Sequence, residues 1–174
     1  MLIDITANTF MQSIQNSILT TFSKFIAIAF DTITLALVAL VISVYLYFKV
    51  SKEKGIFLAS ATIATGIAIK LLKEIFQRAR PLNGLIQESG FAFPSGHVTM
   101  TVVFLGLIVY LFASKKHKLG AVLIATLIVF LVGFTRLYLQ VHWLTDILAS
   151  FVIGGIILAS SIIIYKRVGC TRRV

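Results

Sequence analysis

The stretch LGAVLIATLIVFLVGFTRL, residues 119–137, is an apolar block with a single charged side chain, Arg136. A helix needs about 20 mainly apolar residues, at 1.5 Å per residue, to cross the hydrocarbon core of a bilayer. The stretch therefore predicts a transmembrane helix. Because a charge within or beside a membrane span is costly and usually functional, Arg136 is a first pointer to a site.

Four further apolar blocks accompany this one. The chain is 59% hydrophobic and 13% charged, whereas a soluble domain carries about 25% charged residues. The bilayer is therefore the expected solvent. The expected fold is an all-α integral-membrane helical bundle with about five transmembrane helices, in a single domain over residues 1–174. The four further blocks are residues 28–48, 55–72, 98–113 and 146–165.

Residues 5–26 differ from these blocks, because apolar side chains recur there at three- and four-residue steps between polar ones. This pattern predicts an amphipathic helix lying in the membrane interface. A sixth spanning helix is the alternative, which the polar residues disfavour. The chain thus divides into an interfacial helix (1–27), a transmembrane bundle (28–165) and a basic cytoplasmic tail (166–174), in which Cys170 is the only cysteine and excludes an internal disulfide.

The basic residues predict the orientation of the bundle. The net charge is +10, which in a soluble chain would suggest nucleic acid. Here most basic residues flank apolar blocks, so we expect topology to explain them and expect no nucleic-acid partner. Ten of them share one side if five helices alternate, which places that side and the C-terminus in the cytoplasm. They are Lys49, Lys52, Lys54, Lys115, Lys116, Lys118, Lys166, Arg167, Arg172 and Arg173.

The opposite, extracytoplasmic side would then carry the N-terminus and the connections 73–97 and 136–146. Most of the remaining basic residues cluster around these two connections, against the topological rule. A charge held in such a place usually has a function, so we expect an anionic ligand there. The six remaining basic residues are Lys24, Lys70, Lys73, Arg78, Arg80 and Arg136.

The first chemical block is KEIFQRARP, residues 73–81. Lys73 and Arg80 are seven residues apart, about two helical turns, so we expect them to share a helix face, with Pro81 ending the helix. A lysine and an arginine on one face can clamp phosphate oxygens. The alternative is a basic helix end whose side chains extend towards the membrane surface.

The second block, FPSGH, directly precedes an apolar span. Ser95 suits the N-cap of a helix, and Gly96 lets the backbone approach a ligand. Amides at a helix start, with the helix dipole behind them, form an anion site, and His97 would lie at its rim. The alternative is an ordinary capped helix start with an incidental histidine.

The third block is TRLYLQVHWLTD, residues 135–146. Arg136 offers another fork for phosphate, and the i, i+4 spacing of His142 and Asp146 lets the two meet on a helix. A carboxylate that accepts one imidazole N–H fixes the tautomer and leaves the other nitrogen free for attack. A structural His–Asp hydrogen bond is the alternative. The third histidine of the chain, His117, lies in the basic SKKHK loop and is expected at the solvated surface.

Together the three blocks resemble the signature of the type 2 phosphatidic acid phosphatase (PAP2) superfamily, K-x6-R-P, then P-S-G-H, then S-R-x5-H-x3-D. Every spacing matches over residues 73–146, and the one departure is Thr135, which keeps the hydroxyl of the usual serine. Membrane members of the family commonly have six spans. By this resemblance we expect the first span to be absent here, because residues 5–26 resemble the outer-surface helix that usually follows it.

The resemblance implies a metal-independent lipid phosphatase without a cofactor. It implies that His142 attacks phosphorus, that Asp146 orients His142, and that His97 protonates the leaving oxygen. The same resemblance assigns the phosphoryl oxygens to Lys73, Arg80, Ser95, Gly96 and Arg136. The cations already supply the positive charge that a metal would bring, and their field would repel one.

The implied substrate is a phosphorylated membrane lipid. Candidates are undecaprenyl pyrophosphate, phosphatidylglycerol phosphate, phosphatidic acid and the 1-phosphate of lipid A. Two other classes remain: the related vanadium haloperoxidases, which are soluble and larger, and a non-catalytic lipid-binding or transport protein on the same fold. A monomer is the default expectation.

Overall fold

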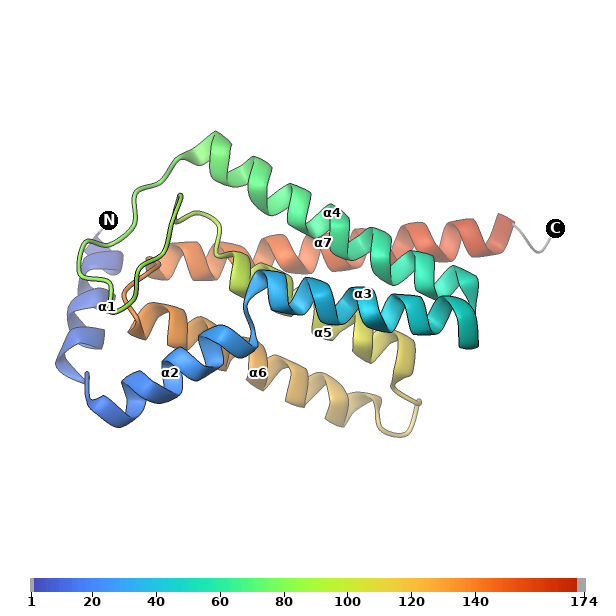
Figure 1. Cartoon of the computed structure of the whole chain (residues 1–174), viewed down its shortest axis with the longest axis horizontal. Helices are drawn as coiled ribbons and strands as arrows, with labels where there is room; N and C mark the ends of the chain where they lie inside the picture. Colours follow the sequence, from blue (N-terminus) through green and yellow to red (C-terminus); the bar gives the residue numbers. More distant parts are fainter. Residues whose placement is uncertain (1, 172–174) are drawn as a thin grey trace.

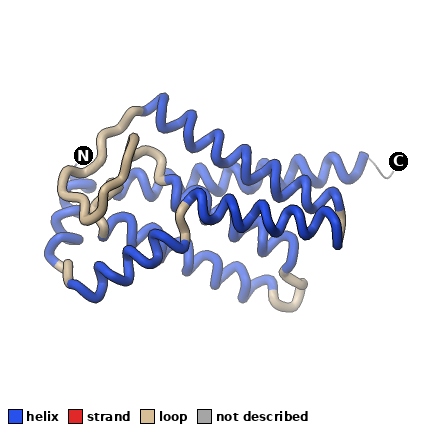
Figure 2. Tube along the Cα trace, in the orientation of Figure 1, coloured by secondary structure: helices blue, strands red, loops and turns tan. Residues whose placement is uncertain are grey.

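The computed structural model describes residues 2–171, with side chains as far as Val168. Within these residues the chain forms seven helices and no strand (Figure 2). The expected all-α fold is confirmed, while Cys170 and the last basic residues lie outside the side chains described. The helices are α1 (Leu2–Ser13), α2 (Ser17–Ala29), α3 (Thr32–Lys49), α4 (Lys52–Phe76), α5 (Gly96–Phe112), α6 (Lys118–Tyr138) and α7 (Leu144–Thr171).

Five helices, α3 to α7, run along the long axis of the molecule and correspond to the five apolar blocks (Figure 1). Within the described chain, α3, α4, α6 and α7 are long and apolar enough to cross a membrane. The fifth, α5, is apolar but only 17 residues long, and it packs against all four of the others. Its central place explains why Val98, Val103 and Leu107 are fully buried.

Small residues allow the close packing around α5. A Cβ atom added at Gly154 of α7 would lie 2.8 Å from Val102 Cβ and 3.2 Å from the backbone oxygen of Thr99. Because such a contact is closer than real Cβ atoms adopt, glycine is required where α7 crosses α5. The helix α7 also continues to Thr171, so the first part of the segment expected as a basic tail is helical.

The N-terminal segment forms two helices, so the expectation of one amphipathic helix over residues 5–26 was wrong in this respect. The break follows from a tertiary contact that spacing along the segment does not reveal. The Asn16 side chain accepts from the Leu19 amide at 2.9 Å and caps α2. The Asn16 amide donates to the Tyr138 hydroxyl of α6 at 3.0 Å. As Figure 1 shows, α1 lies across one end of the bundle.

Candidate active site

The three sequence blocks meet at the end of the bundle that α1 covers (Figure 1). The connection between α4 and α5 folds back over this end and is held by backbone hydrogen bonds. The Leu85 amide donates to the Leu139 carbonyl at 2.9 Å, and the Ala92 amide donates to the Arg78 carbonyl at 2.8 Å. The first bond fixes the connection against the segment that joins α6 to α7, and the second joins the two arms of the connection itself.

The first block is not one continuous helix, so the expected shared helix face of Lys73 and Arg80 was wrong. The helix α4 ends at Phe76, and Gln77 adopts a left-handed conformation with φ of 43°. The following residues pair with the connection instead of continuing the helix. Lys73 Nζ donates to the Phe91 carbonyl, and Arg80 Nε donates to the Gly90 carbonyl at 3.0 Å. The connection, not helical spacing, brings the two cations together.

Arg136 is fully buried and is the centre of the cationic cluster. It forms an ion pair with Glu88, whose other carboxylate oxygen lies 3.7 Å from Arg80 Nη2. Burial by itself would raise the pKa of Glu88, but Arg136 and Arg80 hold that pKa below its usual value. Nε and Nη1 of Arg136 are buried and have no acceptor among the described residues. Buried donors without partners are costly, so this geometry suits an anionic guest.

His142 lies in the connection just before α7 and is 1% exposed. Its Nε2 lies 3.3 Å from Arg80 Nη1, and its Nδ1 lies 3.7 Å from an oxygen of Asp146. Burial lowers the pKa of His142 to about 4, more strongly than Asp146 raises it. The imidazole is therefore neutral at pH 7. The two side chains face one another although His142 precedes the helix, but His142 Nδ1 makes no hydrogen bond with any described residue.

The second block begins α5, as expected, but Ser95 makes no side-chain cap. Its Oγ is buried without a partner among the described residues, and its amide already donates to the Ser150 hydroxyl oxygen at 2.8 Å. The Ser95 amide is thus taken, while its hydroxyl is available. A Cβ at Gly96 would lie 2.8 Å from Thr32 Oγ1, so glycine permits α5 to begin beside α3. His97 is 7% exposed, with Nε2 3.4 Å from Asp31.

Sequence reasoning assigned no role to Arg78, Glu88 or Asp4. Arg78 donates to Asp146, to Thr145 Oγ1 at 2.7 Å and to Asp4 at 2.7 Å. The Thr145 amide donates to Asp4 at 2.9 Å, which ties α1 to the start of α7. A fully buried carboxylate such as Asp146 requires a counter-charge. The need of Asp146 for a nearby cation could have indicated a role for Arg78, whereas no sequence feature indicated a role for Asp4.

A cavity of about 390 Å³ opens beside the cluster. Two apolar side chains, Ile28 and Ile86, form part of its wall. Its polar lining comes from α2, α3, the α4–α5 connection, α5 and α6, and it consists of Lys24, Asp31, Thr34, Glu88, His97 and Arg136. Two of the candidate site residues, His97 and Arg136, therefore face this space.

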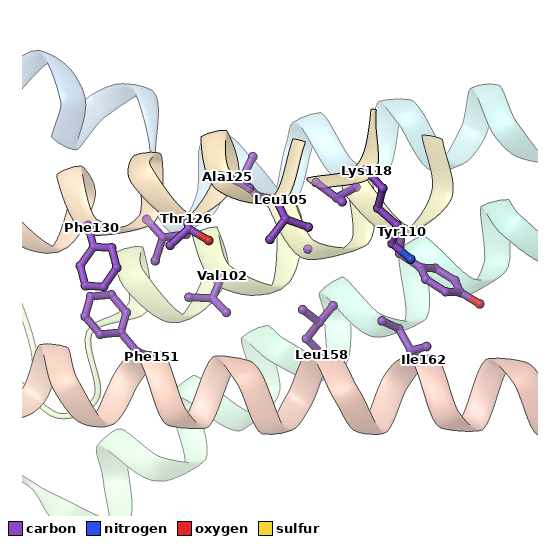
Figure 3. Close-up of a pocket in the computed structure, with 14 residues that line it drawn as sticks. Val102, Leu105, Tyr110, Lys118, Ala125, Thr126, Phe130, Phe151, Leu158 and Ile162 are labelled. Atoms are coloured by element: carbon purple, nitrogen blue, oxygen red, sulfur yellow. The ribbon is translucent and has the colours of Figure 1, made fainter. Parts of the chain in front are cut away.

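Two other cavities lie away from the cluster. One, of about 440 Å³, lies between α5, α6 and α7, where Figure 3 shows Leu105, Phe130, Phe151 and Leu158 facing inward. The other, of about 760 Å³, lies between α4 and α7. Neither is lined by any candidate site residue. Among the described residues, no group of three or more His, Cys, Asp or Glu side chains is arranged to hold a metal ion.

Four helices of the described chain are long and apolar enough to cross a membrane, and they surround a buried cationic cluster. This arrangement defines the class of the protein as a multi-pass membrane protein. The pattern of the PAP2 superfamily matches residues 54–170. The chain belongs to the PAP2 superfamily.

Two solved structures have the same fold. The chain is similar to a transmembrane PAP2 type phosphatidylglycerolphosphate phosphatase from Bacillus subtilis, with 27% identity, a TM-score of 0.87, and coverage of 94% of this chain and 85% of that one. LpxE of Aquifex aeolicus aligns with a TM-score of 0.73 and 23% identity, covering 91% of this chain and 94% of that one, and shows the fold alone.

Three curated proteins are similar in sequence. Phosphatidylglycerophosphatase B of Bacillus subtilis is 41% identical over 91 residues, which cover 49% of this chain and 45% of that protein. Lipid A 1-phosphatase of Rhizobium etli is 27% identical over 66% of this chain and 52% of that protein. Undecaprenyl-diphosphatase of Sulfolobus acidocaldarius is 25% identical over 66% of this chain and 57% of that protein. The chain thus spans about half the length of the curated relatives it matches.

Proposed function

We propose that this protein is an integral-membrane phosphatase that hydrolyses a phosphate monoester or pyrophosphate of a membrane lipid, through a phosphohistidine on His142 and without a metal. One observation carries the proposal. Arg136 has buried donors without partners and shares Glu88 with Arg80, whose Nη1 lies 3.3 Å from His142 Nε2. A phosphoryl group supplies the oxygen acceptors that these donors lack.

The nucleophile in this scheme is His142 Nε2. The Asp146 carboxylate near Nδ1 favours the tautomer with the proton on Nδ1, which leaves a lone pair on Nε2. Nε2 forms a bond to phosphorus while the bond from phosphorus to the leaving oxygen breaks. Asp146 then stabilises the positive charge that develops on the ring.

The cations hold the phosphoryl group during this transfer. Phosphoryl transfer depends mainly on positioning and on stabilising charge, so Lys73, Arg80 and Arg136 suit the task. The unpartnered hydroxyl of Ser95 adds a neutral donor. The amide of Gly96, at the start of α5, is the proposed second donor of this block. Glu88 lies against Nη2 of both guanidinium groups, so its negative charge opposes a phosphoryl group bound to the remaining donors of Arg136.

His97 completes the cycle as the acid and base. It donates a proton to the leaving oxygen, which departs as the lipid product. It then accepts a proton from water as the water oxygen attacks phosphorus, and the Nε2–phosphorus bond breaks to release inorganic phosphate. The Asp31 oxygen lies 3.4 Å from its Nε2 and orients the imidazole.

The relatives indicate the range of substrates: their names specify phosphatidylglycerol phosphate, lipid A 1-phosphate and undecaprenyl diphosphate. We propose a substrate among these lipids or phosphatidic acid. The distribution of basic residues supports an extracytoplasmic site and a cytoplasmic C-terminus. A monomer is the default proposal for the protein in the bilayer.

The decisive experiment measures phosphate release by the purified protein in detergent, from a panel of lipid phosphates and pyrophosphates, with and without EDTA. The His142→Ala variant should lose activity by a factor of about a thousand or more. His117→Ala is the matched control, because His117 is exposed at the opposite end. EDTA-resistant release that requires His142 supports the proposal. No release from any lipid would favour a non-catalytic lipid-binding protein.

A further inference from the structure

Lys24 is a basic residue for which the catalytic scheme has no use. It lies on α2, on the side of the bundle where the positive-inside rule disfavours lysine. Its side chain lines the same cavity as His97 and Arg136. A lysine so placed, beside the catalytic groups, points to a role in binding.

The position of Lys24 is fixed by the way α2 packs on α6. The Tyr138 hydroxyl of α6 donates to the Asn16 carbonyl at 3.1 Å and lies 3.0 Å from Thr20 Oγ1. Ile26 and Ala27, which follow Lys24 on α2, are buried in the core. Because Arg136 belongs to the same α6, the α2 backbone that carries Lys24 is held at a set distance from the phosphate pocket.

The charges around the cavity leave Lys24 uncompensated. Asp31 accepts from the Ile33 amide at 2.8 Å and faces His97 with its other oxygen. Glu88 is paired with both arginines of the cluster. The exposed side chain of Lys24 makes no hydrogen bond or ion pair with any described residue. The ammonium group of Lys24 is therefore available to pair with an anionic group of a ligand in this cavity.

The catalytic scheme decides which part of the substrate meets Lys24. His97 protonates the leaving oxygen, so the first atoms of the leaving group lie beside His97, in this cavity. We propose that Lys24 forms a subsite for a second phosphate group, carried by the leaving group of the substrate. The inference rests on the proposed function. It assigns the enzyme to lipids with two phosphates, either a lipid diphosphate or a lipid whose phosphomonoester follows a phosphodiester.

The test compares kcat/KM for farnesyl phosphate, farnesyl diphosphate and phosphatidylglycerol phosphate. Lys24→Gln should lower kcat/KM about tenfold for a lipid with two phosphates and leave farnesyl phosphate unchanged, since one charge-assisted contact is lost. Lys24→Arg should restore the value. Lys70→Gln is the control, because Lys70 is exposed and does not line the cavity.

The pattern of loss identifies the second phosphate. A loss confined to farnesyl diphosphate assigns a directly linked phosphate, and a loss confined to phosphatidylglycerol phosphate assigns the phosphodiester. An equal loss for all three lipids, or no loss for any, overturns the subsite while the phosphatase function stands.

A binding measurement separates this proposal from the proposed function. Calorimetry in detergent would compare methylenediphosphonate, which is not hydrolysed, with inorganic phosphate, using wild-type protein and Lys24→Gln. Weaker binding of the diphosphonate alone in the variant supports the subsite, even if the wild-type protein releases phosphate from no lipid. Equal binding of both ligands by both proteins overturns it.

Discussion

The two ends of the bundle treat their basic residues in opposite ways. At the end covered by α1, Arg136 is fully buried and paired with Glu88 (Figure 1). At the opposite end, Lys115 and Lys116 are exposed in the turn between α5 and α6, and Lys118 lines the apolar cavity of Figure 3. Exposed lysines cost little and set the orientation in the membrane. A buried guanidinium is costly, so its retention indicates a function.

This difference predicts where substitutions matter, and the largest effect in this series is expected at Asp146. Asp146→Asn removes the charge that, in the proposed mechanism, orients and stabilises His142, and it should lower kcat by about a hundredfold or more. Phosphate-release kinetics would measure this, with Lys116→Gln at the opposite end as control. A wild-type rate for Asp146→Asn would contradict the orienting role. An equal loss of kcat in Lys116→Gln would contradict the proposed functional difference between the two ends of the bundle.

A smaller effect is expected at Arg78, which contacts Asp146 and not the phosphate cluster. Arg78→Gln should lower kcat about tenfold and leave KM nearly unchanged, because it acts through the position of Asp146. The matched variant is Arg80→Gln, which should raise KM. If Arg78→Gln instead raised KM alone, Arg78 would belong with the phosphate ligands.

A substitution of Glu88 is expected to have the opposite effect, because removing its negative charge should strengthen anion binding. Glu88→Gln frees Arg80 and Arg136 from a competing carboxylate. Inorganic phosphate should then inhibit several-fold more strongly. The inhibition constant would be measured beside that of Glu74→Gln, an exposed acidic residue at the end of α4. Weaker inhibition in Glu88→Gln would mean that Glu88 organises the guanidinium groups instead of competing with phosphate.

The mildest test is the pH dependence. Burial lowers the pKa of His142 to about 4, so the nucleophile stays neutral well below the usual histidine value of 6.5. The acid limb of kcat/KM should therefore fall near pH 4, and a limb at pH 6.5 would contradict a buried neutral nucleophile. Because the unfolded chain binds this proton more readily, the folded state should also lose stability as the pH falls from 6.5 towards 4.

The sequence was informative where a single helix obeyed a local rule. The apolar blocks 98–113 and 119–137 correspond to Gly96–Phe112 and Lys118–Tyr138. Hydrophobic length fixes such segments, since a bilayer admits few other solutions. The spacing of the three signature blocks likewise identified residues that the fold gathers at one end.

Only the tertiary structure determined how that end is assembled. The break between α1 and α2 depends on Tyr138, and the end of α4 at Phe76 depends on a connection that pairs with it. The partnership of Asp4 with Arg78 joins residues 74 positions apart in the chain. The sequence by itself determined the membrane helices and the chemical groups, because both follow from local composition. The tertiary structure alone decided which charges are paired and which are left for a ligand, because those pairings depend on long-range packing of polar side chains.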